Sequence, residues 1–286
     1  MKFEIKALLT RVLSKSVYNL ISASSKSVFY FGNKYQCTFC RGRFRKLVTR
    51  GRNLPVNTEQ RIVGSGSRPN SVCPWCGSVD RERLIYLYLK TKTNVFTANL
   101  KLLHIAPEKK LESVLKKLHN LEYLSADLVS PQVMIKMDIT NIQYIDNWFD
   151  AIIGNHVLEH IPNDQQAMSE LFRVLKPGGW AILQVPISLS LSQTYEDPTV
   201  SSPAERERHF GQKDHVRIYA KDYKYRLEKS GFSVEVCDLA KELGESKYHK
   251  YGLVRDEHVY FCKKPLYPSE LNLSQTDKLT ASCSQR

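Results

Sequence analysis

The chain has 286 residues, of which 42% are apolar and 25% are charged, as in an ordinary folded protein rather than a disordered one. No uncharged apolar run approaches the ~20 residues that a membrane-spanning helix needs. The N-terminal region also lacks the compact apolar stretch and small-residue cleavage site of a secretory signal. We therefore expect a cytoplasmic protein without a transmembrane segment.

The net charge of +13 is unevenly distributed along the chain. Residues 1–92 hold 18 basic and 4 acidic side chains, whereas residues 93–286 hold 24 and 25. One end is strongly basic and the remainder is close to neutral. This asymmetry predicts two parts with different partners.

Residues 1–33 alternate apolar side chains with basic or hydroxyl ones. The apolar residues from Leu9 to Ile21 recur at helical spacing, which predicts a basic amphipathic helix. Such a helix either packs on its own protein or contacts a membrane surface or a partner. The sequence leaves both interpretations open.

Two C-x2-C pairs mark residues 34–92: Cys37 with Cys40, and Cys73 with Cys76. Without a secretory signal, paired cysteines are read first as metal ligands. A structural Zn²⁺ takes four thiolates in a tetrahedron, and this spacing lets one tight turn aim two sulfurs at one ion. The residues between the pairs are too polar to form an apolar core. The pattern therefore predicts a closed zinc ribbon rather than four free thiols or a redox pair.

The stretch between the two pairs is also the most basic part of the chain. Its basic residues are Arg41, Arg43, Arg45, Lys46, Arg50, Arg52, Arg61 and Arg68, and its only acid is Glu59. Basic side chains on a zinc-braced loop, with aromatic residues among them, can follow the phosphate backbone of RNA. A solvated loop, or one docked on an acidic neighbour, explains the same pattern equally well.

The remaining elements alternate between strands and helices. A helix with Ser78 as its N-cap comes first. Strands are then expected at 102–106, 121–126, 133–137, 149–154 and 180–185, with helices at 108–119 and 164–175. This alternation predicts a parallel, doubly wound α/β sheet within residues 93–264.

The last predicted elements depart from that alternation. A helix at 220–230 precedes strands at 232–237 and 258–263, with no clear helix between the two strands. We expect these strands to form an antiparallel hairpin at the sheet edge. The polar residues 265–286 are expected to be disordered.

Two aspartates follow the second and third predicted strands. In an open α/β sheet, ligands bind in the crevice outside the carboxyl ends of the strands. Asp127 and Asp138 should face that crevice, where a carboxylate can accept hydrogen bonds from ribose hydroxyls or help to hold an adenine. A surface aspartate in a turn is the alternative for each residue taken alone.

The run from Phe149 to Pro186 carries a family resemblance. The segments FDAIIGNHVLEHI (149–161) and LFRVLKPGG (171–179), followed by a strand, resemble the class I S-adenosylmethionine-dependent methyltransferases of type 11. The resemblance covers roughly residues 100–263 and implies a Rossmann-like, seven-stranded sheet with a terminal antiparallel hairpin. The paired cysteines are also similar to those of a zinc-bearing subgroup of these enzymes.

The resemblance also implies roles for individual residues. Asp127 matches the acidic residue that binds the cofactor ribose, and Asp138 and Ile139 match the residues beside the adenine. Asn155 and His156 match the end of the fourth strand, beside the methyl donor.

The loop after the first strand departs from the family pattern. Such enzymes usually have an acidic residue and a Gly-x-Gly loop there, whereas this chain has Ala106-Pro107-Glu108. Glycines allow the backbone to approach the cofactor closely, and Pro107 removes an amide donor. We expect altered binding, with Ala106 keeping the bulk small and Glu108 at the cofactor's amino group. Loss of cofactor binding is the alternative.

The segment between the fifth strand and the last helix is too rich in polar residues for a simple connector. In the resembled family this region covers the acceptor pocket. Methyl transfer mainly requires alignment, plus a base when the acceptor is a hydroxyl. The candidates for that base are His156, His209, Asp214 and His215, because a histidine near its natural pKa can take a proton. A structural His–Asp hydrogen bond is the alternative for each.

The sequence thus predicts a methyltransferase with S-adenosylmethionine as cofactor and a structural Zn²⁺, acting through oxygen or nitrogen of a small or carbohydrate-like acceptor. Two alternatives remain. One is an RNA methyltransferase whose basic ribbon binds the substrate. The other is a non-catalytic binding module whose Ala106–Glu108 loop no longer holds the cofactor.

Overall fold

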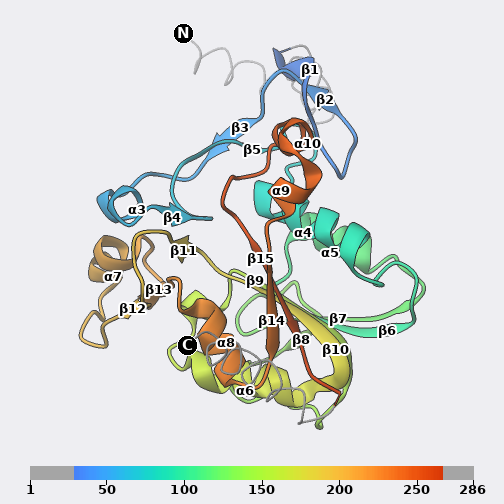
Figure 1. Ribbon diagram of the computed structural model, residues 1–286, viewed down its shortest axis with the longest axis vertical. Helices are drawn as coiled ribbons and strands as arrows, with labels where there is room; N and C mark the ends of the chain where they lie inside the picture. The colour runs from blue at the N-terminus through green and yellow to red at the C-terminus, as the bar shows by residue number, and fades with distance from the viewer. Residues whose placement is uncertain (1–28, 267–286) are drawn as a thin grey trace, which may run out of the picture.

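A computed structural model describes residues 29–266 of the chain (Figure 1). Most of the predicted N-terminal helix and the polar tail from residue 267 lie outside the described residues. No helix in the described part of the chain is long and apolar enough to cross a membrane.

A seven-stranded sheet forms the centre of the protein, in the order β14-β15-β10-β9-β6-β7-β8. Its parallel strands are β6 (Leu100–Ile105), β7 (Leu121–Asp127), β8 (Ile135–Lys136), β9 (Phe149–Asn155) and β10 (Leu175–Gln184). The edge strands β15 (Val259–Lys263) and β14 (Ser233–Cys237) are antiparallel to their neighbours. This topology confirms the predicted doubly wound α/β fold and its terminal antiparallel pair.

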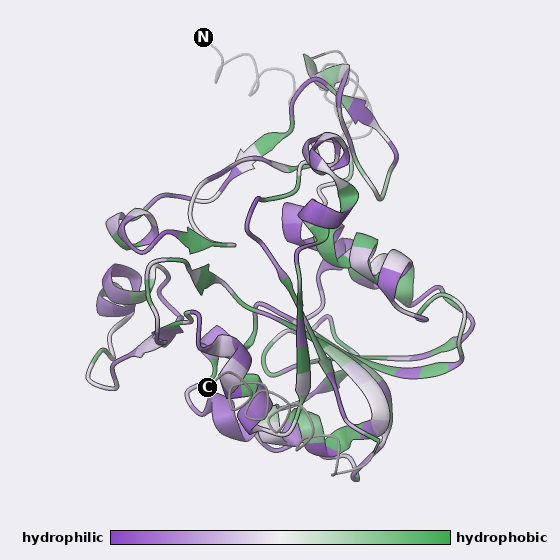
Figure 2. Cartoon of the chain, viewed as in Figure 1, coloured by the Kyte–Doolittle hydropathy of each residue, from purple (hydrophilic) through white to green (hydrophobic). Residues whose placement is uncertain are grey.

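Helices cover both faces of the sheet, because successive residues of the buried strands point to opposite sides. On one face, Leu102 and Ile153 pack with α4 (Asp80–Lys92), α5 (Lys109–Leu115) and the short α9 (Leu239–Leu243) and α10 (Glu245–Tyr251). On the other face, Leu103 and Ile152 pack with α6 (Asp164–Val174) and α8 (Tyr223–Lys229). The strands accordingly include strongly hydrophobic stretches in Figure 2. Each face has its own apolar core.

Two local predictions were wrong. The connection between β14 and β15 contains α9 and α10, of five and seven residues, where no helix was expected. Asp238 caps α9, and left-handed Gly252 ends α10. The N-cap of α4 is Val79 rather than Ser78, because the Glu82 carboxylate accepts the Val79 amide and the Ser78 hydroxyl is used elsewhere.

The N-terminal segment (residues 29–79) crosses from α10 to the carboxyl edge of the sheet in short elements (Figure 1). These are β1 (Phe31–Gln36), β2 (Arg43–Phe44), β3 (Val48–Arg50), α3 (Pro55–Glu59), β4 (Ile62–Val63) and β5 (Arg68–Val72). The pairs are β1 with β2 and β3 with β5, while β4 pairs with β11 (Ile187–Ser188), the strand that follows β10. The basic segment is therefore folded onto the α/β domain at both of its ends.

A buried arginine joins the two parts. Arg83 is 0% exposed and donates hydrogen bonds to the carbonyl oxygens of Ser78, Tyr251 and Gly252. It thus ties α4 to the end of α10 and to the residues after the second cysteine pair. The predicted boundary between residues 92 and 93 stays a prediction, although α4 packs in the same apolar core as the strands.

Candidate functional site

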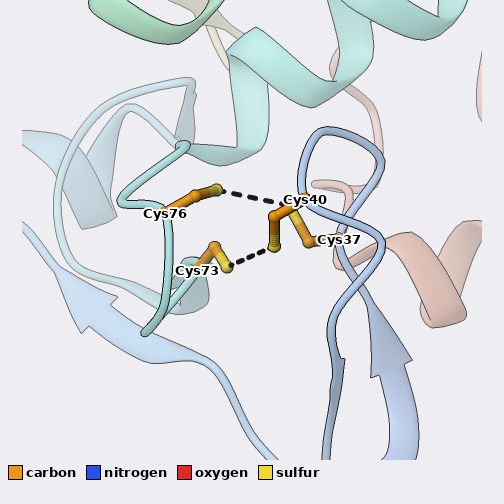
Figure 3. Close-up of side chains that lie close together, drawn as sticks. All are labelled: Cys37, Cys40, Cys73 and Cys76. Atoms are coloured by element: carbon orange, nitrogen blue, oxygen red, sulfur yellow. Dashed lines mark hydrogen bonds between the residues drawn. The ribbon is translucent and has the colours of Figure 1, made fainter. Parts of the chain in front are cut away.

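The four paired cysteines meet in one cluster, between β1 and β2 on one side and between β5 and α4 on the other (Figure 3). The Sγ atoms of Cys37 and Cys76 lie 3.6 Å apart, and those of Cys40 and Cys73 lie 3.7 Å apart. A tetrahedral zinc ion with Zn–S bonds of about 2.3 Å holds its sulfurs about 3.8 Å apart. The donor set and its spacing therefore fit one such ion.

Ser78 adds a polar contact beside this cluster. Its hydroxyl oxygen lies 3.2 Å from the Cys37 Sγ and 3.3 Å from the Cys76 Sγ. A hydroxyl at this distance can donate a hydrogen bond to a thiolate sulfur, which steadies a charged ligand. The residue that the sequence indicated as a helix cap thus belongs to the cysteine site.

Two left-handed residues turn the chain away from the carboxyl edge of the sheet. Ala106 follows β6 with φ of 45°, and His156 follows β9 with φ of 58°. Glycine is the residue that adopts this conformation without strain. The loop after β6 therefore keeps a glycine-like backbone at Ala106, although the sequence has no glycine there.

Glu108 lies among polar groups from three elements at this edge. Its carboxylate accepts a hydrogen bond from the Asn155 amide and lies 3.5 Å from the His104 Nε2 and 3.9 Å from the Arg81 Nε. Burial alone would raise the pKa of Glu108, but His104 and Arg81 outweigh it and lower the pKa below its usual range. Glu108 is therefore a carboxylate at neutral pH.

The two predicted cofactor aspartates follow neighbouring strands. The Asp127 Oδ1 accepts the amides of Val129 and Ser130, both at 2.7 Å, and the Asp138 Oδ1 accepts the amide and hydroxyl of Thr140. None of these four bonds uses an Oδ2 atom. In the register of the sheet, Asp127 of β7 lies opposite Lys136 of β8, and Lys136 comes two residues before Asp138. Ile139 is 4% exposed and packs in the apolar core.

A second polar cluster surrounds His156. Its Nδ1 lies 3.3 Å from the Glu159 Oε1, and its Nε2 lies 3.9 Å from the Glu257 Oε1. Burial opposes protonation of His156, but the two carboxylates outweigh it and raise its pKa. Gly64 lies against the imidazole ring of His156, since a Cβ added to Gly64 would lie 3.0 Å from the His156 Cε1. The N-terminal segment therefore closes this part of the edge.

The other predicted base candidates occupy two places. His215 is 3% exposed and lies with Glu159 and His160, and Asp214 contacts His160 from solvent. Burial lowers the pKa of His215 to about 4, so its imidazole is neutral at physiological pH. His209 lies apart, on α7 (Pro203–Phe210), with its Nδ1 3.0 Å from the Tyr195 hydroxyl. The structure thus brings His156 and His215 to one cluster and leaves His209 outside it.

His209 lines a cavity of about 820 Å³ between α3 and α7. Its wall includes Val56 and Gln60 from the N-terminal segment, and Tyr195 and Ile218 from the insert after β10. This volume is within the ~300–1,000 Å³ that is usual for small-molecule sites. The cavity borders the insert rather than the ends of β6 and β7.

Many buried polar atoms at the carboxyl edge have no hydrogen-bond partner among the described residues. They belong to Arg81, His104, Glu108, Asn155, His156, Glu159, His215 and Glu257. Folded proteins pair nearly all such atoms, so a concentration of them indicates groups that bind something else, whether water or ligand. Sequence reasoning did not select Arg81, His104, Glu159 or Glu257. The two residues Glu159 and His160 lie within the 149–161 motif, whereas nothing in the sequence marks Glu257.

Comparisons with known proteins match the part of the chain that forms the parallel strands. Residues 98–183 match the family described as methyltransferase domain. A stretch of 124 residues is 23% identical to the arsenite methyltransferase of Aquipseudomonas alcaligenes, covering 39% of this chain and 34% of that protein. The chain thus spans about a third of the length of this curated relative. These sequence matches support a class I S-adenosylmethionine-dependent methyltransferase domain around the parallel strands.

Solved structures with similar folds include three that differ in activity. The cyclase SpnF is 16% identical with a TM-score of 0.47, covering 65% of this chain and 82% of its own. A SAM-dependent methyltransferase of Archaeoglobus fulgidus is 16% identical with a TM-score of 0.41, and the match covers 64% of this chain and 94% of that one. Phosphoethanolamine N-methyltransferase 2 of Haemonchus contortus is 15% identical with a TM-score of 0.44, and the match covers 70% of this chain and 55% of that one.

Proposed function

We propose that this protein transfers a methyl group from S-adenosylmethionine to oxygen or nitrogen of a small or carbohydrate-like acceptor. The observation that carries the proposal is the group of unpartnered polar atoms at the ends of β6 and β9, within the stretch that matches the methyltransferase family. The bound cofactor would supply an electrophilic methyl on a sulfonium. The chain's own residues would bind, orient and shield it.

The residues at the edge fit that cofactor. Glu108 Oε2, which is 3.5 Å from the His104 Nε2, and Asn155 Oδ1 are buried acceptors without a hydrogen bond among the described residues, which suits a positively charged amino group. In this proposal Asp127 accepts the ribose hydroxyls through Oδ2, and Asp138 and Ile139 lie beside the adenine. The left-handed backbone at Ala106 supports a close approach despite the missing glycines.

Proton handling would fall to the histidines at this edge. Two carboxylates raise the pKa of His156 and favour its protonated form, so its role would be to position charge rather than to accept a proton. His215 is neutral, with Nε2 unpartnered. His209 would act on the acceptor side, where the cavity between α3 and α7 offers room for the acceptor. Asp214 lies apart from this cavity, beside His160, and would act through that histidine.

Calorimetry with S-adenosylmethionine and S-adenosylhomocysteine tests the cofactor proposal. The wild-type protein should bind both, and Glu108→Gln and Asp127→Asn should each weaken binding by roughly tenfold or more. Glu245→Gln, an exposed carboxylate on α10, is the matched control and should bind normally. Absence of binding at millimolar cofactor would remove the enzymatic proposal.

We also propose that the cysteine cluster holds a structural Zn²⁺. Four thiolates would complete its coordination and leave no position for a substrate, which favours a structural role. Metal analysis of the purified protein should show zinc bound to the cluster. Cys40→Ala should lose it, and Cys237→Ser, in β14 and outside the cluster, should keep it.

One surface favours RNA as a second candidate substrate. Arg43, Arg45 and Lys46 are exposed on the N-terminal segment, and Arg45 and Lys46 lie over the exposed ring of Phe29. Exposed cations beside aromatic rings are suited to phosphates and stacked bases. If RNA is the substrate, affinity should fall steeply between low and physiological salt. An affinity that hardly changes with salt would exclude this candidate.

A further inference from the structure

We propose that Glu159, His160 and His215 form a binding site for a divalent transition-metal ion, distinct from the cysteine cluster. One donor atom from each residue lies within 4.8 Å of the other two. Donors bound to one tetrahedral ion at about 2.1 Å lie about 3.4 Å apart, so the side chains must close by up to about 1.4 Å to complete the site.

The two segments that supply the ligands are fixed to each other. Glu159 and His160 belong to the 3₁₀ turn η1 (Leu158–His160) directly after β9, and His215 precedes β13 (Arg217–Ile218). The Val216 amide donates to the Glu159 carbonyl at 2.9 Å. The buried Arg217 guanidinium donates to the carbonyls of Leu158, Ile161 and Pro162. The three side chains are therefore held together before any ion binds.

Two of the three donor residues are buried. Glu159 is 1% exposed; its Oε1 lies 3.3 Å from the His156 Nδ1, whereas its Oε2 has no hydrogen-bond partner among the described residues. His215 is 3% exposed, and its Nε2 has no hydrogen-bond partner among the described residues. Both residues line a small cavity of about 10 Å³, together with Ser65 and Arg217. A space of this size holds about one water-sized particle, and a carboxylate oxygen and an imidazole nitrogen without hydrogen bonds are suited to a cation there.

The neighbouring charges favour a cation as well. Three carboxylates lie around the site: Glu159 itself, Glu257 beyond His156, and the exposed Asp214 beside His160. His156, which lies between Glu159 and Glu257, offsets one of these charges when it is protonated. Arg217 turns its guanidinium to backbone carbonyls and to Glu196, so three carboxylates against one imidazole leave the site favourable to a cation.

The donor set indicates the class of ion. Two imidazoles and one carboxylate suit Zn²⁺, Co²⁺, Mn²⁺ or Fe²⁺, whereas Ca²⁺ and Mg²⁺ prefer oxygen ligands alone. Three protein ligands leave at least one coordination position open. The half-exposed His160 leaves one side of the site open to solvent, so a water molecule can take this position. Metal binding does not rest on the proposed methyl transfer.

Titration with Co²⁺ of the full-length protein holding one equivalent of zinc tests the site, because the four thiolates of the cysteine cluster take that zinc ion. Wild-type protein should bind one further equivalent and show weak visible d–d bands without an intense sulfur-to-cobalt charge-transfer band. His215→Ala and His160→Gln should weaken Co²⁺ binding at least tenfold. His249→Ala, an exposed histidine on α10, should bind Co²⁺ as the wild type does.

Each outcome has a definite reading. Failure of the wild-type protein to bind extra Co²⁺, or equal binding by His160→Gln, means that the cavity holds only water and overturns the proposal. Retained zinc and unchanged thermal unfolding in His160→Gln, a half-exposed residue, show that lost Co²⁺ binding is not lost folding. Co²⁺ binding without S-adenosylmethionine binding would leave the metal site standing and remove the proposed methyl transfer.

Discussion

The N-terminal segment and the α/β domain are stabilised in different ways. The sheet buries a large apolar core on each face. Among the described residues, the N-terminal segment has a small cluster around Cys37, Phe44, Leu47 and Cys73, two of them cysteines of the proposed zinc site. Its Ile62 packs in another small cluster with residues of the insert after β10. We therefore expect that apolar burial holds one region, whereas the proposed metal ligation and a few anchoring contacts hold the other.

Removal of zinc should separate the two regions most strongly. In Cys73→Ala, amide exchange between residues 37 and 76 should quicken at least about tenfold, because the small cluster cannot fold without its ion. Exchange in β6, β9 and β10 should change little. Hydrogen exchange with mass spectrometry measures both variants, and Cys237→Ser is the control. Equal protection of the segment in both variants would mean that apolar contacts suffice there.

Loss of Arg83 should weaken the joint between the regions. Arg83→Ala leaves three carbonyls without their donor and should reduce the free energy of unfolding by about 3 kcal/mol. Arg255→Ala, an exposed arginine paired with Glu245, should lower it by less than about 0.5 kcal/mol. Urea unfolding measures both. Similar losses in the two variants would contradict the anchoring role of Arg83.

The contact of Gly64 with His156 can be tested with a matched pair of glycines. Gly64 and Gly77 have φ of 83° and 77°, but an added Cβ meets His156 at Gly64 and open space at Gly77. Gly64→Ala should therefore reduce stability by about 1 kcal/mol more than Gly77→Ala, since a positive φ of similar size strains an alanine at either position. Thermal or urea unfolding gives the difference, and no difference would mean that the segment moves away freely.

The smallest effect is expected at Ala106. Ala106→Gly relieves the left-handed strain and should raise the free energy of unfolding by about 0.5 kcal/mol or leave it unchanged. Ala240→Gly in α9 should instead lower it by about 0.5–1 kcal/mol, because glycine weakens a helix. Opposite signs in urea unfolding support the backbone conformation at Ala106. A loss of stability at both positions would contradict it.

The sheet was predictable because its signal is local and repeated. Buried strands such as β9 appear as short apolar runs, and α6 keeps helical periodicity over eleven residues. The short α9 and α10 were missed because five and seven residues hold too little periodicity to be recognised. Ser78 was wrongly assigned as a helix cap because a serine hydroxyl can bond either to a helix N-terminus or to a cysteine sulfur. Which of the two it contacts depends on the tertiary structure.

The candidate site was predictable only in its strand-end residues. Topology places Asp127, Asp138 and Asn155 at one edge of any parallel sheet, so their positions follow from strand order. Glu257 and Gly64 reach His156 from a loop before β15 and from the N-terminal segment. No spacing rule joins residues so distant in sequence, and their part in the site becomes visible only in three dimensions.

The pairing of β4 with β11 sets an order for folding during synthesis. Cys37 and Cys76 are 39 residues apart, so the metal cluster can close soon after it leaves the ribosome. The Ser188 hydroxyl, which donates to the Gln60 carbonyl, is translated 128 residues after its acceptor. The N-terminal segment can therefore form its own local pairs early, but it docks on β11 only after most of the sheet has been translated.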